Sequence, residues 1–332
     1  MILSDATLDD LAPLAALAEA PFANILGLTA ETVERRWTGE ATAHLQQQGS
    51  IGIVAKDGGR ACGFVAVTPL PWETRVLGKP LAALRCLGVV QDLPGREGVA
   101  TELVGEAVAR ARTAGMVALT CKTTGDDDAV SAALTARGFR LMDTLVDFVY
   151  DVRRHQVPPE ADAAQRAVAA GFTIRPAMPG DLERLMETAR ASFTGHFGRF
   201  HADPRIGPEQ GTRVYEEWIR SCVNGWADWI VVAEKDNRIA GYSAWKHPSE
   251  SDLALGIRLG HYSIAGIHPD FFGHGLFTAL TREGLMYLSS RADFAEGPTH
   301  EDNHPVIRGY LKLGWTEAGR QRSYHKWLDE DG

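Results

Sequence analysis

One glycine-rich turn between an apolar strand and an apolar helix decides the fold, and its sequence is Ile267-His268-Pro269-Asp270-Phe271-Phe272-Gly273-His274-Gly275-Leu276-Phe277. Residues 261–267 before it are typical of a strand, and Leu276, Leu280 and Leu288 recur at helical spacing. Glycine lets backbone N–H groups come close to a ligand, and the start of a helix adds partial positive charge. The stretch therefore predicts an anion site, although one such turn is weak support because tight turns need glycine anyway.

The same order of features occurs twice along the chain, at a nearly constant offset that pairs Ile2 with Ile174 and Gly63 with Gly241. Each copy starts with a strand that runs into an acid-started helix, continues through a hairpin, and reaches the glycine-rich turn. Each copy closes with a further helix and a Gly-aromatic step into a last strand. The repeat predicts two α/β domains and a linker, at residues 1–152, 172–332 and 153–171 respectively.

Composition excludes several classes of protein. The 332 residues suggest about two domains, and 45% apolar and 23% charged residues are typical of a globular protein. A net charge of −9 without a basic cluster argues against a nucleic-acid partner. No apolar run reaches the ~18 residues that a membrane span needs, and the acidic N-terminus lacks a signal-peptide pattern. Four scattered cysteines without a CxxC pair fit free thiols, so we expect a cytoplasmic protein.

The turn and the elements around it resemble the GNAT superfamily of acetyl-CoA-dependent N-acetyltransferases, whose turn has the pattern V-x-P-x-x-(R/Q)-x-x-G-x-(G/A). The second copy follows this pattern at 267–277 and the first at 90–100. Both depart from it, because the R/Q position is Phe272 or Gly95 and the last small residue is Phe277 in the second copy. The resemblance covers nearly the whole chain. It implies two tandem GNAT domains, each a mixed, mostly antiparallel twisted sheet flanked by helices, with acetyl-CoA as co-substrate and no metal.

This resemblance assigns acyl-CoA binding to the second copy. The residues that it implies are Ile267, Phe272, Gly273, His274, Gly275, Leu276, Phe277 and Asn303. A second CoA site, in the first copy, would use Val90, Arg96, Glu97, Gly98, Val99 and Ala100. The cradle depends on backbone groups more than on side chains, so we expect it to survive the departures in the second copy.

A second family pattern, N-x-x-A-x-x-x-Y-x-x-x-G-F, brings Asn303 and Tyr310 into register. In the family the Asn binds the pantetheine arm and the Tyr lies near the thioester sulfur, so the resemblance implies Tyr310 as the acid for the leaving thiolate. The aligned residues of the first copy are Asp127 and Leu134, so the acid is missing there. His261 stands where family members often carry a Glu base, and histidine suits proton removal from an ammonium acceptor, directly or through water. We therefore expect a catalytic second copy and a non-catalytic first copy.

An insert in the second copy predicts the acceptor site. Within the GNAT resemblance, the chain is similar to the dTDP-fucosamine acetyltransferase group, on residues 72–78 and on the insert at 197–218, and its two-domain layout is like that of mycothiol synthase. Two arginines of the insert would hold a nucleotide diphosphate, and its aromatic side chains would stack on a base or sugar. The implied acceptor residues are Arg199, His201, Arg205, Tyr215 and Trp218. The alternative is a surface loop followed by an amphipathic helix.

We expect acetyl transfer to a primary amine, with an amino-sugar nucleotide as the first choice of acceptor. The alternatives are a small-molecule amine of secondary metabolism or thiol biosynthesis, and a non-catalytic CoA-binding module. A zinc hydrolase on the HExxH string from His300 to His304 is disfavoured, because Pro305 keeps the second histidine out of a continuous helix. His261 and Tyr310 each have the alternative role of a buried core residue. We expect a monomer or homodimer without nucleic-acid or membrane partners.

Overall fold

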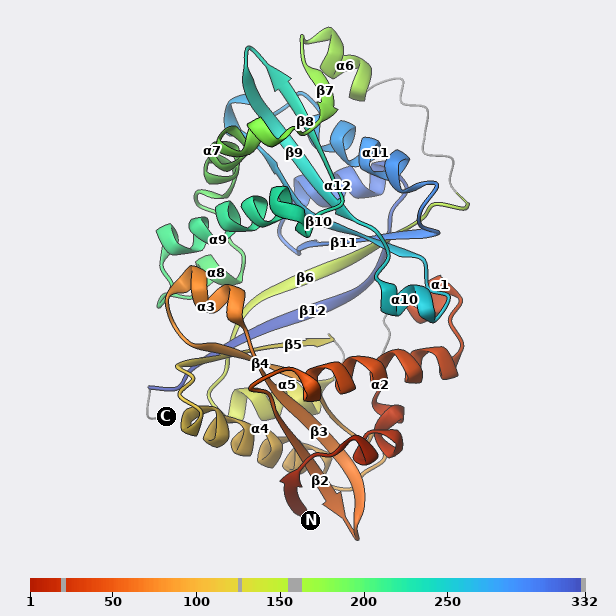
Figure 1. Cartoon of the computed structure of the whole chain (residues 1–332), viewed down its shortest axis with the longest axis vertical. Coiled ribbons are helices and arrows are strands. Elements are labelled where there is room, and N and C mark those ends of the chain that lie inside the picture. The colour runs from red at the N-terminus through yellow and green to blue at the C-terminus, as the bar shows by residue number, and fades with distance from the viewer. Residues whose placement is uncertain (19–21, 125–126, 155–162, 330–332) are drawn as a thin grey trace. The chain divides into compact units, whose positions relative to one another are not determined.

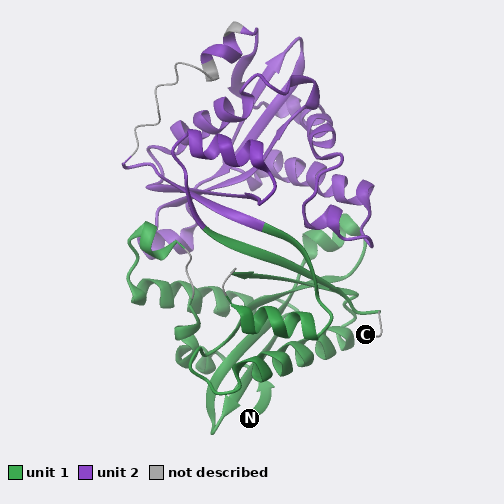
Figure 2. Ribbon diagram, turned by 180° about the vertical axis from the view of Figure 1, so that it is seen from behind, with its two compact units in different colours: residues 1–144, 319–332 green, residues 145–318 purple. Residues whose placement is uncertain are grey.

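The computed structural model describes residues 1–18, 22–124, 127–154 and 163–329 (Figure 1). The chain divides into two compact units (Figure 2). Unit 1 comprises Met1–Thr144 and Gly319–Gly332, and unit 2 comprises Leu145–Ala318. The chain passes from one unit to the other inside two long strands, β6 (Arg140–Asp151) and β12 (Thr316–Trp327).

The first copy of the repeat contains six strands and a set of short and long helices among its described residues. Its strands are β1 (Ile2–Asp5), β2 (Ile51–Asp57), β3 (Arg60–Pro69), β4 (Leu81–Val89), β5 (Ala118–Thr124) and β6. Its helices are η1 (Leu8–Asp10), η2 (Ala12–Leu17), α1 (Ala23–Leu26), α2 (Ala30–Gln46), α3 (Pro71–Leu77), α4 (Arg96–Thr113) and α5 (Asp128–Ala136).

The second copy repeats that order. Its strands are β7 (Thr173–Pro176), β8 (Trp229–Lys235), β9 (Arg238–Lys246), β10 (Leu259–Ile267), β11 (Phe294–His300) and β12. Its helices are α6 (Ala163–Ala169), η3 (Pro179–Asp181), α7 (Leu182–Phe193), α8 (Arg199–Ala202), α9 (Pro208–Ser221), η4 (Cys222–Trp226), α10 (Glu250–Ala254), η5 (Pro269–Phe271), α11 (Leu276–Leu288) and α12 (His304–Lys312). The predicted order of elements is therefore present in both copies.

Each unit completes its sheet with the last strand of the other copy. The strand order is β1-β2-β3-β4-β5-β12 in unit 1 and β7-β8-β9-β10-β11-β6 in unit 2. β12 is antiparallel to β5, and β6 is antiparallel to β11. The compact units therefore cross the boundaries expected at residues 152 and 172. The last strands of the two copies occupy equivalent positions, β12 beside β5 and β6 beside β11.

One neighbouring pair of strands in each unit is parallel, β4 with β5 and β10 with β11, and the others are antiparallel. This confirms the mixed, mostly antiparallel sheet. Helices cover both faces of each sheet (Figure 1). In unit 1, α4 and α5 pack on one face through Leu103 and Leu134, and η2 and α2 pack on the other through Leu14 and Ala41. In unit 2, α11 and α12 cover one face, and α7 packs against β9 and β10.

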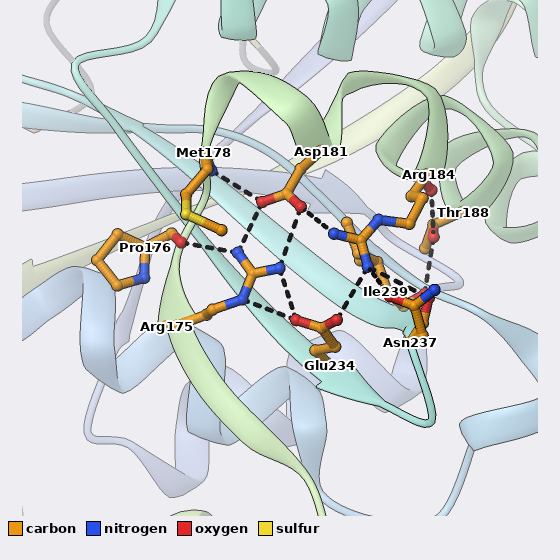
Figure 3. A network of polar contacts seen from close by, with 9 residues as sticks. All are labelled: Arg175, Pro176, Met178, Asp181, Arg184, Thr188, Glu234, Asn237 and Ile239. Carbon is orange, nitrogen blue, oxygen red and sulfur yellow. Dashed lines mark hydrogen bonds and ion pairs between the residues drawn. The ribbon is translucent and has the colours of Figure 1, made fainter.

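In each copy, a buried aspartate fixes the helical segment that follows the first strand to the sheet. This segment is η1 in the first copy and η3 with α7 in the second. In unit 2, Asp181 accepts hydrogen bonds from Arg175 at 2.6 and 3.0 Å, from Arg184, and from the backbone of Met178 (Figure 3). Glu234 on β8 binds the same two guanidinium groups. The Arg175 guanidinium is the largest cause that lowers the pKa of Asp181 to about 2. The network holds the start of α7 against β8.

Unit 1 has a simpler version of that contact. Asp10, at the matching position, pairs with Lys56 of β2 at 2.6 Å and accepts a hydrogen bond from the Thr7 backbone. Burial raises its pKa, but the hydrogen bonds from Lys56 and Thr7 outweigh burial and leave the pKa below its ordinary value. Both acid-started helices therefore begin on an ion pair with the second strand of their copy.

Candidate active site

The parallel strands β10 and β11 diverge part-way along their length. Their pairing runs through Leu259 with Phe294 and Gly260 with Ala295, and ends at His261 with Glu296. β10 nevertheless continues to Ile267. Beyond the last pair, one side of β10 therefore offers backbone N–H and C=O groups to a ligand.

A β-bulge lies directly after that divergence. The register of β10 against β9 shifts between Tyr262 and Ile264, which leaves Ser263 outside the ladder. Ser263 Oγ accepts a hydrogen bond from Trp218 Nε1 at 3.2 Å and lies 3.8 Å from Cys222 Sγ. Bulges re-aim side chains and are common beside active sites. This bulge ties the end of α9 to the point where β10 and β11 separate.

The predicted anion cradle has open space in front of it. Gly273 and Gly275 both have the left-handed φ of 84° and 71°, and α11 begins at Leu276. A side chain added at Gly273 would contact nothing within 4 Å. The first N–H groups of α11 have no partner inside the helix, and its dipole favours negative charge there. The backbone of this turn is therefore suited to hold a phosphate.

The side chains of the cradle have different surroundings. Phe272 is 64% exposed, whereas Leu276 is buried in the core with Ile267 packed against the same cluster. The His274 ring lies 5.2 Å from that of Phe172. The exposed Phe272 side chain has no polar atom, whereas the His274 ring can donate a hydrogen bond, so the cradle would hold a phosphate mainly through its backbone.

Phe277 fills part of the space between α11 and α12. Its ring lies 5.5 Å from that of Tyr310, and a side chain added at Gly309 would approach it to 2.6 Å. Gly309 is therefore needed for this close contact between the two helices. The departure from a small residue at position 277 brings an aromatic ring beside the predicted catalytic tyrosine.

Tyr310 lies in an aromatic core. Phe148, Tyr262, Phe277 and Trp315 surround its ring, with ring centroids between 4.6 and 6.0 Å away. Its hydroxyl faces Gly297 of β11, where an added side chain would come within 2.6 Å of the oxygen. Burial raises the pKa of Tyr310 well above its ordinary value, so the hydroxyl keeps its proton. Tyr310 is therefore a buried core residue, and its hydroxyl also lies beside β11, one of the two diverging strands.

His261 is paired with a carboxylate that the sequence analysis did not single out. His261 Nδ1 lies 2.6 Å from Oε1 of Glu296, and each side chain is 26% exposed. A carboxylate at Nδ1 holds the proton there and leaves Nε2 to accept another. The one available signal for Glu296 was that it is an acidic residue within β11, the short strand that follows α11. His261 is thus part of a partly exposed dyad rather than an isolated core histidine.

Asn303 and the HExxH string lie at the start of α12. Asn303 precedes the helix, and its Nδ2 donates to Thr299 Oγ1 at 3.1 Å. His300 is the last residue of β11, and His304 is the first residue of α12. An HExxH zinc site needs both histidines on one continuous helix. These two histidines do not share one.

The predicted acceptor residues divide into a packed group and a peripheral group. The Tyr215 ring stacks on Phe193 at 3.9 Å and is 8% exposed, so it builds the contact between α7 and α9. His201 Nε2 lies 3.1 Å from Thr212 Oγ1, and burial lowers its pKa. Trp218 reaches the bulge at Ser263, as described above.

The two predicted phosphate-binding arginines lie in and after α8. The Arg199 guanidinium carbon is 4.4 Å from the centre of the Phe200 ring. The Arg205 backbone N–H donates to Asp203, which is buried. Trp218 is the predicted acceptor residue whose hydrogen bond, to Ser263, reaches the diverging strands.

The glycine-rich turn of the first copy has a different conformation. α4 begins at Arg96, directly after Gly95 with its φ of 74°. Arg96, Glu97, Gly98, Val99 and Ala100 are therefore residues of the helix, and not of a loop before it. Gly98 also lacks the positive φ that Gly275 has at the aligned position.

Arg96 itself does not point into an open anion site. Its Nε donates to the Val89 carbonyl at 3.0 Å, and its Nη2 donates to Asp127 Oδ2 at 2.5 Å. Both side chains of the pair are largely buried. Asp127 also accepts from the Val130 backbone at the start of α5. The Arg96 side chain thus joins the ends of β4 and α5, next to Val90.

The fold defines the class of protein. The chain superposes on a tandem GNAT protein from the clavulanic acid biosynthesis pathway with a TM-score of 0.55, at 16% identity, over 100% of this chain and 99% of that one. It superposes on a GCN5-related N-acetyltransferase from Sphaerobacter thermophilus with a TM-score of 0.59, at 16% identity, over 98% and 95%. The chain is a tandem protein of the GNAT fold.

The sequence comparisons point to related acetyltransferases. The model of the Acetyltransferase (GNAT) family matches residues 17–139, within the first copy of the repeat. A mycothiol acetyltransferase of Stackebrandtia nassauensis is 30% identical over 54% of this chain and 55% of its own length. The spore coat polysaccharide biosynthesis protein SpsD of Bacillus subtilis is 27% identical over 47% and 51%. The chain thus spans about half the length of these curated relatives. None of the described helices is long and apolar enough to cross a membrane.

Proposed function

We propose that the protein is an acyl-CoA-dependent N-acetyltransferase, and that unit 2 transfers the acetyl group to the primary amine of a small molecule. The observation that carries this proposal is the His261–Glu296 dyad at the last parallel pair of β10 and β11, with Tyr310 next to β11. The proposed base thus lies where the strand gap begins, and the hydroxyl of the proposed acid approaches β11 at the next residue, Gly297. The family match and the open cradle at Gly273 support acetyl-CoA as the donor.

The chemistry needs two proton movements. An ammonium acceptor must lose a proton before its nitrogen attacks the thioester carbon, and His261 Nε2 accepts that proton directly or through water. Glu296 stabilises the resulting imidazolium. As the carbon–sulfur bond breaks, Tyr310 protonates the thiolate of CoA and later regains a proton from water. Backbone N–H groups of the bulged strand β10 supply donors for the oxyanion.

The proposed acceptor is the amine of an amino sugar or an amino-sugar nucleotide. The similarity to a polysaccharide biosynthesis protein supports this class, and Arg199 and Arg205 near α9 offer cations for a diphosphate. A second candidate is an amine of thiol biosynthesis, which the matches to mycothiol acetyltransferases favour. Because Tyr215 is packed on Phe193, stacking on a base would fall to Trp218.

The test is turnover of acetyl-CoA with a panel of amino sugars, amino-sugar nucleotides and aminothiols, measured by chromatography as formation of CoA and of the acetylated amine. Wild-type protein should turn over at least one class. His261→Gln should lower kcat/KM and remove the acid limb of its pH profile, because a base must be deprotonated to act. His304→Gln, outside the proposed dyad, is the control. Binding of acetyl-CoA without turnover of any amine would favour the CoA-binding module instead.

A further inference from the structure

Three metal-ligating side chains converge in unit 1, on the face of the sheet that α2 covers. Glu40 and His44 belong to α2, and Cys86 belongs to β4. Their donor atoms all lie within 4.8 Å of one another, and His44 Nε2 is 3.7 Å from Glu40 Oε1. This group lies outside the site proposed for acetyl transfer, which is in unit 2.

The backbone directs all three groups to one point. Glu40 and His44 are four residues apart on a helix, so they share one face. Cys86 lies in a β-bulge, where the register of β4 against β3 shifts between Phe64 and Ala66. Its φ of 51° is in the left-handed region, which a non-glycine residue rarely adopts. Such strain persists where the surrounding structure requires it, and it often marks a functional position.

We propose that Glu40, His44 and Cys86 bind one zinc ion, with water as the fourth ligand. Thiolate, imidazole and carboxylate together form a donor set typical of zinc, and three protein ligands plus water complete a tetrahedron. One thiolate and one carboxylate balance the charge of the ion. The Glu40 side chain is 60% exposed and has several rotatable bonds, so it can adjust to the ion and leave a path for water.

Metal binding would change the protonation of one ligand. Burial raises the pKa of the Cys86 thiol to about 12, so the free protein holds a thiol and zinc must displace this proton against that preference. Zinc binding breaks the S–H bond, forms the S–Zn bond and releases the proton to solvent. The hydrogen bond from His44 is the largest cause that lowers the pKa of Glu40, and Arg36 and Arg85 contribute. Glu40 is therefore an anion, and these two arginines are the cations against which zinc competes.

The apolar surroundings would strengthen the site. Trp37, Leu45 and Val90 pack with Cys86 against the core on this face. A low-dielectric shell strengthens the attraction between the ion and its charged ligands. The aligned bulge position in unit 2 is Ser263, which instead accepts a hydrogen bond from Trp218. The aligned bulge position is thus a cysteine in unit 1 and a serine in unit 2. Zinc would tie α2 to β4 and stabilise unit 1.

The experiment is a titration of the metal-stripped full chain with Co²⁺, which substitutes for zinc and reports thiolate ligation by a charge-transfer absorption band. We expect one equivalent to bind, with this band, and added Zn²⁺ to abolish the band by displacement. Zn²⁺ should also raise the Tm, because it binds the folded state. Cys86→Ser should remove the band, while Cys62→Ser, the buried-thiol control in unit 1, should retain it.

Glu40→Gln tests the site even if the Cys86 variant fails to fold, because Glu40 is exposed. It should weaken Co²⁺ affinity by at least the ~10–100-fold typical of losing an outer-sphere partner. An unchanged affinity in Glu40→Gln, or the lack of a charge-transfer band in the wild type, would overturn the proposal. So would a band that persists in Cys86→Ser. None of these outcomes depends on acetyl transfer, which is assayed separately in unit 2.

Discussion

The two copies carry similar glycine-rich turns, but their helices begin at different points. In unit 2 the turn stays in loop conformation through Gly273 and Gly275, and a side chain added at Gly273 would meet open space. In unit 1 the aligned residue is Arg96, which is already helical and is bonded to Val89 and Asp127. A match of letters at the turn therefore does not guarantee the same backbone conformation. The two turns differ in where the helix begins and in the contacts of the residue at the aligned position.

The same comparison holds for the proposed acid. Tyr310 and Leu134 occupy aligned positions. Leu134 is buried in the same core cluster as residues of α4, and Tyr310 is buried in the same core cluster as residues of α11. Burial is thus common to both, and only the hydroxyl is specific to unit 2. The GNAT family match covers the first copy, which lacks that hydroxyl. Family similarity here follows the packing of the fold, and the reacting groups vary independently of it.

The largest expected effect concerns the cradle. The double change Gly273→Asp and Gly275→Asp places two carboxylates where we propose that a phosphate binds, and it also strains two residues with positive φ. We expect calorimetry to detect no acyl-CoA binding to unit 2. The control is Gly95→Asp, which adds one carboxylate at a φ of 74° in unit 1 and should leave the affinity unchanged. Equal loss in both variants would indicate unfolding or a site in unit 1.

The second effect concerns Tyr310. Tyr310→Phe removes one hydroxyl from a buried ring, so the fold and acyl-CoA affinity should be nearly unchanged. If this hydroxyl protonates the thiolate, kcat should fall about 10²-fold or more. Tyr150→Phe removes a hydroxyl from the same core and is the control for packing. Wild-type turnover in Tyr310→Phe, together with lost activity in Gly95→Asp, would move the chemistry to unit 1.

The third effect concerns the two acid-started helices. The pKa of Asp181 is about 2, below its ordinary 3.8, so its charged form stabilises the folded state. This stabilisation is complete above about pH 4 and is lost as the pH falls toward 2, and it amounts to about 2 kcal/mol. Denaturation by urea at several pH values should show that loss.

Asp181→Asn should remove most of this acid dependence and lower the stability at neutral pH. Asp10→Asn should have the smaller effect, because Asp10 pairs with Lys56 alone and Asp181 is bonded to two guanidinium groups. Equal effects of the two substitutions would contradict the view that unit 2 has the stronger anchor.

The last effect, similar in size to that of Asp181, concerns the Arg96 bridge. Arg96→Ala leaves the Val89 carbonyl and Asp127 without this donor, so the free energy of unfolding should fall by about 1–3 kcal/mol. We expect one acyl-CoA per chain in both the wild type and this variant, by calorimetry. Two equivalents in the wild type that fall to one in Arg96→Ala would instead establish the second CoA site, in the first copy.

The sequence by itself determined the repeat, the order of elements and the residues next to each glycine-rich turn. These features depend on periodicity and turn chemistry between near neighbours, which is why the turn at Gly273 and Gly275 was found as a candidate. Asn303 and Tyr310 were found only through the resemblance to a family pattern. The family resemblance gave them roles that the local pattern alone does not specify.

The tertiary structure decided which distant residues meet. The exchange of β6 and β12, the contact of His261 with Glu296, and the convergence of Cys86 with Glu40 and His44 each depend on strand register or on packing between remote elements. A shift of one residue in register would turn each of these strand side chains to the other face of its sheet. Local pattern does not encode such pairings, because their free energy comes from contacts that exist only in the folded chain.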